Sequence, residues 1–275
     1  MPTSSLAYAK RLLSDADLAF IVDGPSSVDD LMGLRQSLAI DESRRAEVLG
    51  DDQLFQRVLA MEDTLVRISP RLFFEVLLRR AIHDITRAVH VLERAGRDRV
   101  PLFVGEREVQ AISRPVVIDY LAEMLASFTK INSHTARVRV RRGVWRKSRY
   151  NDLDVPSLLR LASEGDETRR MAVLQRAGDA SLLILGVFSD FAASAIRYPG
   201  TGTLRRRRAR LTTEEYENVA GRAYKLVADD PATDTSNVEP LRVLSEHVID
   251  AKRPLVYLAE NYLRLHPGNL FGMNA

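Results

Sequence analysis

The 275-residue sequence contains no cysteine. This absence excludes a disulfide framework, thiolate-bound zinc, iron–sulfur clusters and a cysteine nucleophile. A long apolar run is also missing near the start, where Lys10, Arg11, Asp15 and Asp17 interrupt the first twenty residues. We therefore expect no signal peptide and a cytoplasmic location.

Elsewhere in the chain, the longest apolar stretch lies near residues 182–188, between Asp179 and Asp190. It is far shorter than the roughly 20 residues of a membrane-spanning helix, so we expect no membrane contact.

The familiar catalytic and nucleotide-binding motifs are missing as well. Gly200-Thr201-Gly202 supplies two glycines without the dinucleotide-binding fingerprint, and neither a phosphate-binding loop nor a Gly-x-Ser-x-Gly elbow occurs. Glu-x-x-His and His-Glu-x-x-His are also absent. His83 and His90 share a predicted helix face with Glu75, but the arginines around them oppose metal binding. We expect neither a metal site nor a cofactor.

Apolar residues that recur every three or four positions dominate the rest of the sequence, which is typical of amphipathic helices. A serine in Pro25-Ser26-Ser27 stands where a helix N-cap is expected. Another helix is expected to begin near Thr212 and Thr213, where Glu215 or Glu214 supports a capping arrangement. The pattern predicts an all-α fold, a bundle of about 8–10 helices. We expect a single domain over residues 1–275, with a subdivision near residues 135–152 as the alternative.

The clearest predicted helix covers residues 70–94. Phe73, Phe74 and Leu77 begin a wide apolar face, and the polar residues fill the opposite side. We expect that polar side, which includes Glu75 and Arg79, to face solvent. A second long helix is predicted over residues 167–198, and it is the most apolar of the chain.

Residues 135–150 break the helical pattern. Val138 and Val140 alternate with Arg139 and Arg141, and Arg142-Gly143 is suited to a turn. The alternation predicts a short basic β-hairpin near residues 136–149, with an irregular basic loop as the alternative.

Basic residues are concentrated in two stretches without an acid. Residues 135–150 carry seven cations and residues 191–213 carry six, so the remaining 27 cations face 37 acids and give a net charge of −10, although the whole chain is +3. Only five of the 40 cations are lysine, a bias that genomic composition explains as readily as function does. The candidate residues for binding an anionic partner are Arg139, Arg141, Arg142, Arg146, Arg205, Arg206, Arg207 and Arg208.

Two kinds of partner suit these stretches, nucleic acid and an acidic protein. Arginine offers a planar fork of donors that matches phosphate and carboxylate, and Trp145 and Tyr150 are available to stack on bases. The alternative interpretation is two solvated loops, or loops that pair with another copy of the chain in a homo-oligomer.

A second candidate site lies on the apolar helix that includes Gly186. Asp179, Asp190 and Arg197 fall with Gly186 on one narrow side of the helical wheel. Buried carboxylates need partners, which makes these three residues candidates for catalysis or ligand binding, and Gly186 would let a backbone or a ligand approach closely. The alternative is an exposed stripe or a structural Asp–Arg pair.

The sequence thus leaves three hypotheses open. A non-enzymatic binding protein that uses its arginine-rich loops ranks first, and a structural or oligomer-forming bundle ranks second. An enzyme or small-ligand receptor with a pocket around Asp179 and Asp190 ranks third.

Overall fold

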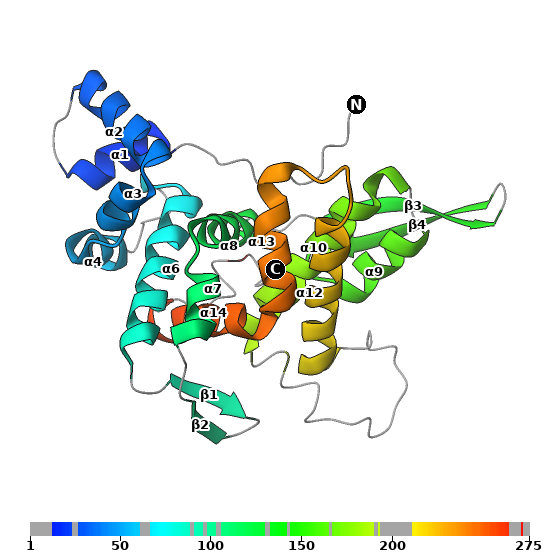
Figure 1. The fold of residues 1–275 in the computed structure, drawn as a ribbon. Helices are drawn as coiled ribbons and strands as arrows, with labels where there is room; N and C mark the ends of the chain where they lie inside the picture. The colour runs from blue at the N-terminus through cyan, green and yellow to red at the C-terminus, as the bar shows by residue number, and fades with distance from the viewer. Residues whose placement is uncertain are drawn as a thin grey trace.

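A computed structural model describes residues 13–23, 27–60, 67–88, 91–95, 98–102, 106–129, 133–141, 144–164, 167–189, 192, 211–263 and 271. The fold is an all-α assembly of many helices, as the periodicity predicts, with two hairpins attached to it (Figure 1). Twelve helices lie within the described residues, and they are α1 (Asp15–Val22), α2 (Val28–Ile40), α3 (Glu42–Leu49), α4 (Asp52–Ala60), α6 (Pro70–Arg87), α7 (Glu106–Ile112), α8 (Pro115–Phe128), α9 (Val155–Glu164), α10 (Glu167–Gly186), α12 (Thr213–Ala228), α13 (Thr235–Glu246) and α14 (Val248–Asn261).

Local capping chemistry explains where several of these helices begin. Capping boxes start α1 at Ser14, α2 at Ser27 and α12 at Thr212, where the Glu215 carboxylate accepts the backbone N–H of Thr212. Pro70 occupies the first turn of α6, where a missing N–H does no harm, and the Ser69 hydroxyl accepts the N–H of Leu72.

The core lies where α6, α8, α10, α12 and α14 meet (Figure 1). Helix α10 packs against α9, α12 and α14, while α6 packs against α8 and α14. Helix α8 is buried on most of its surface, from Val117 to Phe128. The short helices α1 to α4 lie together on the α6 side of this core (Figure 1).

The helix that begins at Pro70 is shorter than predicted, because it ends at Arg87 and not near residue 94. Ala88 is extended, and the chain then forms an antiparallel hairpin of β1 (Val91–Ala95) and β2 (Asp98–Leu102). The apolar periodicity of α6 continues by coincidence into a segment that pairs with residues farther along the chain.

The predicted basic hairpin is present and slightly longer than expected. Strand β3 (Ser133–Arg141) pairs antiparallel with β4 (Val144–Asn151). Strand β3 lies beside α9, and Figure 1 shows the hairpin reaching outward from the helical body. At about 3.3 Å per residue, its nine-residue strand spans about 30 Å.

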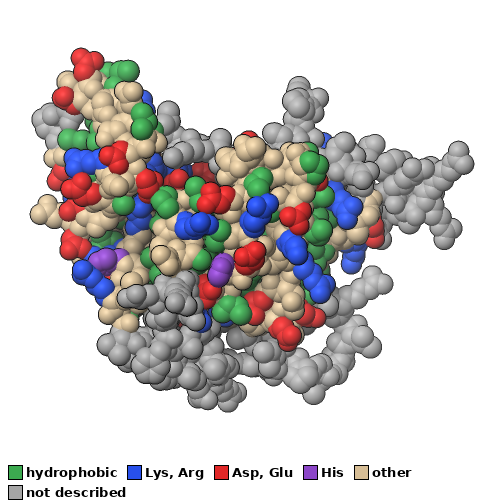
Figure 2. Space-filling view, viewed as in Figure 1, with side chains coloured by type: hydrophobic (Ala, Val, Ile, Leu, Met, Phe, Trp, Pro, Cys, Tyr) green, Lys and Arg blue, Asp and Glu red, His purple; other side chains and the backbone are tan. Residues whose placement is uncertain are grey.

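Within the described part of the chain, no helix combines the length and the apolar character needed to cross a membrane. On the face shown in Figure 2, the described acidic and basic side chains are interspersed over the helical body.

Candidate functional site

The pairing of β3 with β4 determines which residues of the hairpin share a face. Arg137 is opposite Lys147, Arg139 is opposite Trp145, and Thr135 is opposite Arg149. Opposite positions share a face and faces alternate along a strand, so the register groups these residues together. We call this set the basic face, and its members are Thr135, Arg137, Arg139, Trp145, Lys147 and Arg149.

A β-bulge near the turn changes which of the predicted arginines share a face of the hairpin. After Arg139 pairs with Trp145, the next pair is Arg141 with Val144, and Val140 is the extra residue between them. Arg141 therefore shares a face with Val144, opposite the basic face. Arg146 also lies there, because it pairs with Val138.

Of the hairpin residues singled out from the sequence, the register thus places Arg139 on the basic face and moves Arg141 and Arg146 to the other. It adds Arg137, which alternation along β3 already groups with Arg139. It also adds Lys147 and Arg149, which join this face only because of the extra residue near the turn. Arg142 itself lies outside the described residues.

Several other predicted site residues also lie outside the described part of the chain, and they are Asp190, Arg197, Arg205, Arg206, Arg207 and Arg208. Their grouping with the hairpin or with Asp179 stays a prediction.

Asp179 is fully buried on α10, in agreement with a polar position on an apolar helix. Its Oδ1 atom accepts hydrogen bonds from the hydroxyls of Tyr120, at 2.8 Å, and Tyr224, at 3.1 Å. The Gln175 amide donates to the Tyr120 hydroxyl at 3.1 Å. These bonds join α8, α10 and α12, and they give the buried carboxylate hydrogen-bond partners within the core.

The close packing around Asp179 depends on a neighbouring glycine. A Cβ atom added at Gly178 would lie 2.9 Å from Cε1 of Tyr224, so only glycine lets that ring approach α10 this closely. The Tyr120 and Tyr224 rings meet edge to face, with centroids 6.2 Å apart. This network is a tightly filled part of the core.

A second buried polar cluster centres on Glu75 of α6, which was expected to face solvent. Its carboxylate is fully buried and accepts two hydrogen bonds from Arg45 of α3, at 2.7 and 2.6 Å. Arg79 lies 3.0 Å from the same carboxylate and also pairs with Glu42. The polar side of α6 is thus covered by α3 near Glu75 and is exposed farther along, at His83 and Arg87.

The same cluster extends to α8 through Arg71. This guanidinium pairs with Asp119 at 2.8 Å and with Glu123 at 3.4 Å. Arginine and carboxylate groups from three helices thereby hold α3, α6 and α8 together.

The surroundings of Glu75 and Asp119 shift the pKa values of these two carboxyl groups in opposite directions. Burial alone would raise the pKa of Glu75, but the hydrogen bonds from Arg45 and the charges of Arg45, Arg79 and Arg71 outweigh it and lower the pKa to about 2. Burial raises the pKa of Asp119, and the negative charge of Glu75 raises it further, against the effect of Arg45 and Arg71. The pKa of Glu75 is thus lowered while that of Asp119 is raised, so Glu75 keeps its charge to a lower pH than Asp119 does.

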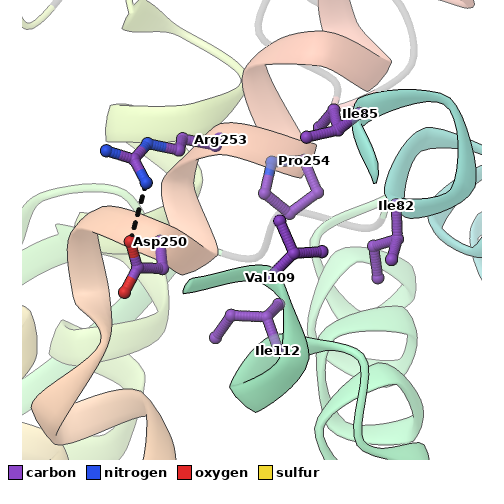
Figure 3. A pocket seen from close by; sticks show the side chains of 7 residues that line it. All are labelled: Ile82, Ile85, Val109, Ile112, Asp250, Arg253 and Pro254. Carbon is purple, nitrogen blue, oxygen red and sulfur yellow. Dashed lines mark hydrogen bonds and ion pairs between the residues drawn. The ribbon is translucent and has the colours of Figure 1, made fainter. Parts of the chain in front are cut away.

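Two hollows in the helical body differ in what they can hold. Figure 3 shows the smaller one, an apolar void of about 10 Å³ beside the Asp250–Arg253 ion pair, with room for about one water molecule. The larger is an open hollow of about 810 Å³ between α7 and α13. It carries both signs of charge, because Arg114 and Glu239 pair there at 3.3 Å, and Asp179 lines neither hollow.

Across the described residues, no group of three or more acidic and histidine side chains is arranged to hold a metal ion. Comparison with known proteins adds no assignment: no family model matches the sequence, and no curated protein or solved structure matches it significantly.

Proposed function

We propose that this chain is a non-enzymatic binding protein that uses the basic face of the β3–β4 hairpin to hold a nucleic acid. The observation that carries the proposal is the register, which groups Arg137, Arg139, Lys147 and Arg149 on one face. Neighbours on one strand lie about 6.7 Å apart along that face, and opposite residues lie about 5 Å apart. No acid occurs anywhere in residues 133–151 to neutralise them.

The directly opposed pair Arg137 and Lys147 adds a second argument. Like charges at opposite register positions destabilise a hairpin, so the pair lowers the stability of the free protein. A bound polyanion would relieve this repulsion and release the counterions that the cations and the phosphates hold in solution.

Trp145 favours nucleic acid over an acidic protein. It stands opposite Arg139 on the basic face and is the only tryptophan of the chain. A nucleic acid offers a flat base beside every phosphate, so stacking and arginine contacts can occur together along its whole length, whereas an acidic surface of a protein has no such repeating pair.

We expect labelled oligonucleotides of about 20 nucleotides to bind at low salt, with binding measured by fluorescence polarisation. With four cations in contact, the logarithm of the association constant should fall with the logarithm of salt concentration with a slope of roughly −3 to −4. Quenching of Trp145 fluorescence should accompany binding if a base stacks there.

The double variant R137Q/K147Q should bind about tenfold more weakly at low salt and lose about 2 units of slope. The matched control is R222Q/K225Q, which removes one arginine and one lysine from exposed positions on α12 and should change little. Unchanged affinity in R137Q/K147Q would refute the proposal. Equal affinity for polyglutamate, without tryptophan quenching, would instead identify an acidic protein as the partner.

A further inference from the structure

One side chain of the core contacts residues on either side of the β3–β4 hairpin, one at the end of α8 and one directly after β4. Helix α8 ends at Phe128, shortly before β3, and Asp152 directly follows β4. Arg176 of α10 contacts both of these segments. Its Nη1 atom donates to the Ser127 hydroxyl at 2.6 Å, and its Nη2 atom donates to the Asp152 carboxylate at 3.0 Å.

The Arg176 guanidinium also makes a cation–π contact with Phe128. Its central carbon lies 3.5 Å from the centroid of the buried Phe128 ring. The side chains of Arg176 and Asp152 are each only 11% exposed, so solvent screens their ion pair little. One planar group thereby makes an ion pair, a hydrogen bond and a cation–π contact.

The segments that carry Arg176 and Asp152 are each held in place by further hydrogen bonds. Next to Arg176, the buried Gln175 donates to the Tyr120 hydroxyl and so ties α10 to the Asp179 network. At the end of β4, the Asn151 side chain accepts a hydrogen bond from the N–H of Leu153 at 3.1 Å. Just beyond it, the Asp154 carboxylate accepts one from the Ser157 hydroxyl at 2.8 Å. The chain that leaves β4 is therefore held by hydrogen bonds up to the start of α9.

We propose that Arg176 is the positioning residue that fixes the direction of the hairpin relative to the helical body. The inference rests on the proposed function, because a fixed direction matters only if the basic face has a partner. A hairpin held in place loses less conformational freedom on binding than one that swings, so Arg176 increases affinity without touching the nucleic acid. Lysine cannot replace it fully, since an ammonium group lacks the planar fork and the stacking face.

Trp145 reports the motion of the hairpin directly, since no other tryptophan contributes to the fluorescence. The test variant is R176M/D152N, which removes both charges and leaves neither one buried alone. The matched control is R253M/D250N, which removes a similarly covered arginine–aspartate pair from α14, with side chains 14% and 19% exposed. All variants are compared under conditions where far-UV circular dichroism is unchanged.

We expect R176M/D152N to lower the anisotropy of Trp145 and to weaken oligonucleotide binding about three- to tenfold, the effect of lost pre-organisation. R176K should recover part of both effects, and R253M/D250N should cause neither. Unchanged anisotropy in R176M/D152N, or an equal fall in R253M/D250N, would overturn the role of Arg176. Wild-type protein that binds no oligonucleotide would overturn the proposed function instead, and the anisotropy would still decide whether Arg176 holds the hairpin.

Discussion

Replacing Glu75 with glutamine should lower the free energy of unfolding by about 3–5 kcal/mol, the effect of breaking a buried ion pair from one side. The substitution keeps the shape of the side chain but removes the negative charge that faces three arginines. Arg79 and Arg71 retain Glu42 and Asp119 as partners, whereas Arg45 loses its two short hydrogen bonds to a carboxylate. Urea denaturation measures the change.

The matched control for this substitution is Glu47→Gln. Glu47 pairs with Arg44 at 2.8 Å, but both side chains are at least half exposed. Exposed pairs contribute about 0–1 kcal/mol, so this variant should unfold almost as the wild type does. If E75Q and E47Q were equally stable, the buried cluster would not be what holds α3 to α6.

Acid gives an independent check on Glu75. Its pKa in the folded protein is about 2, below the ordinary 4.5, so its ionised form stabilises the folded state above pH 4.5. That contribution is lost as the pH falls through about 2. The stability difference between wild type and E75Q should therefore shrink between pH 4.5 and pH 2, and a constant difference over that range would contradict this assignment of charge.

Adding one methyl group at Gly186 should also destabilise the protein, by about 3 kcal/mol. A Cβ atom there would lie 2.9 Å from Cδ1 of Leu255 and closer still to its Cβ, which is fixed to the backbone of α14. Neither Leu255 nor its helix can move without opening the contact between α10 and α14. Thermal and urea unfolding of Gly186→Ala measure the effect.

Replacing Gly33 with alanine should instead increase the stability of the protein. Gly33 is in the middle of α2, and a Cβ atom added there meets nothing within 4 Å. Alanine favours a helix over glycine by about 1 kcal/mol, so Gly33→Ala should stabilise the protein slightly. If both alanine variants changed stability alike, the close approach at Gly186 would not be real.

Local signals in the sequence predict much of this architecture. The serines before α2 and the threonines before α12 predict helix starts, because capping depends on residues three positions apart. The structure selects Ser27, Thr212 and Glu215 among the candidates. The alternation of Val138 with Arg139 likewise predicts the basic hairpin. Gly186 was expected to let another segment approach its helix closely, and Leu255 of α14 lies close to it.

What the sequence does not reveal depends on contacts between distant residues. Nothing near Glu75 indicates that Arg45, thirty positions earlier, covers it. The hydroxyls that bind Asp179 come from residues 59 and 45 positions away, so the sequence left open whether Asp179 is buried and did not identify its partners. The bulge at Val140 moves Arg141 to the other face, and alternation alone cannot anticipate an extra residue in one strand.

Hydrogen–deuterium exchange with and without a bound oligonucleotide tests most directly whether the hairpin is the binding site, because it surveys the whole chain without choosing residues in advance. We predict that the nucleic acid slows exchange mainly in peptides from residues 133–151 and leaves α12 and α13 unchanged. Protection confined to other segments, with none in residues 133–151, would contradict the account.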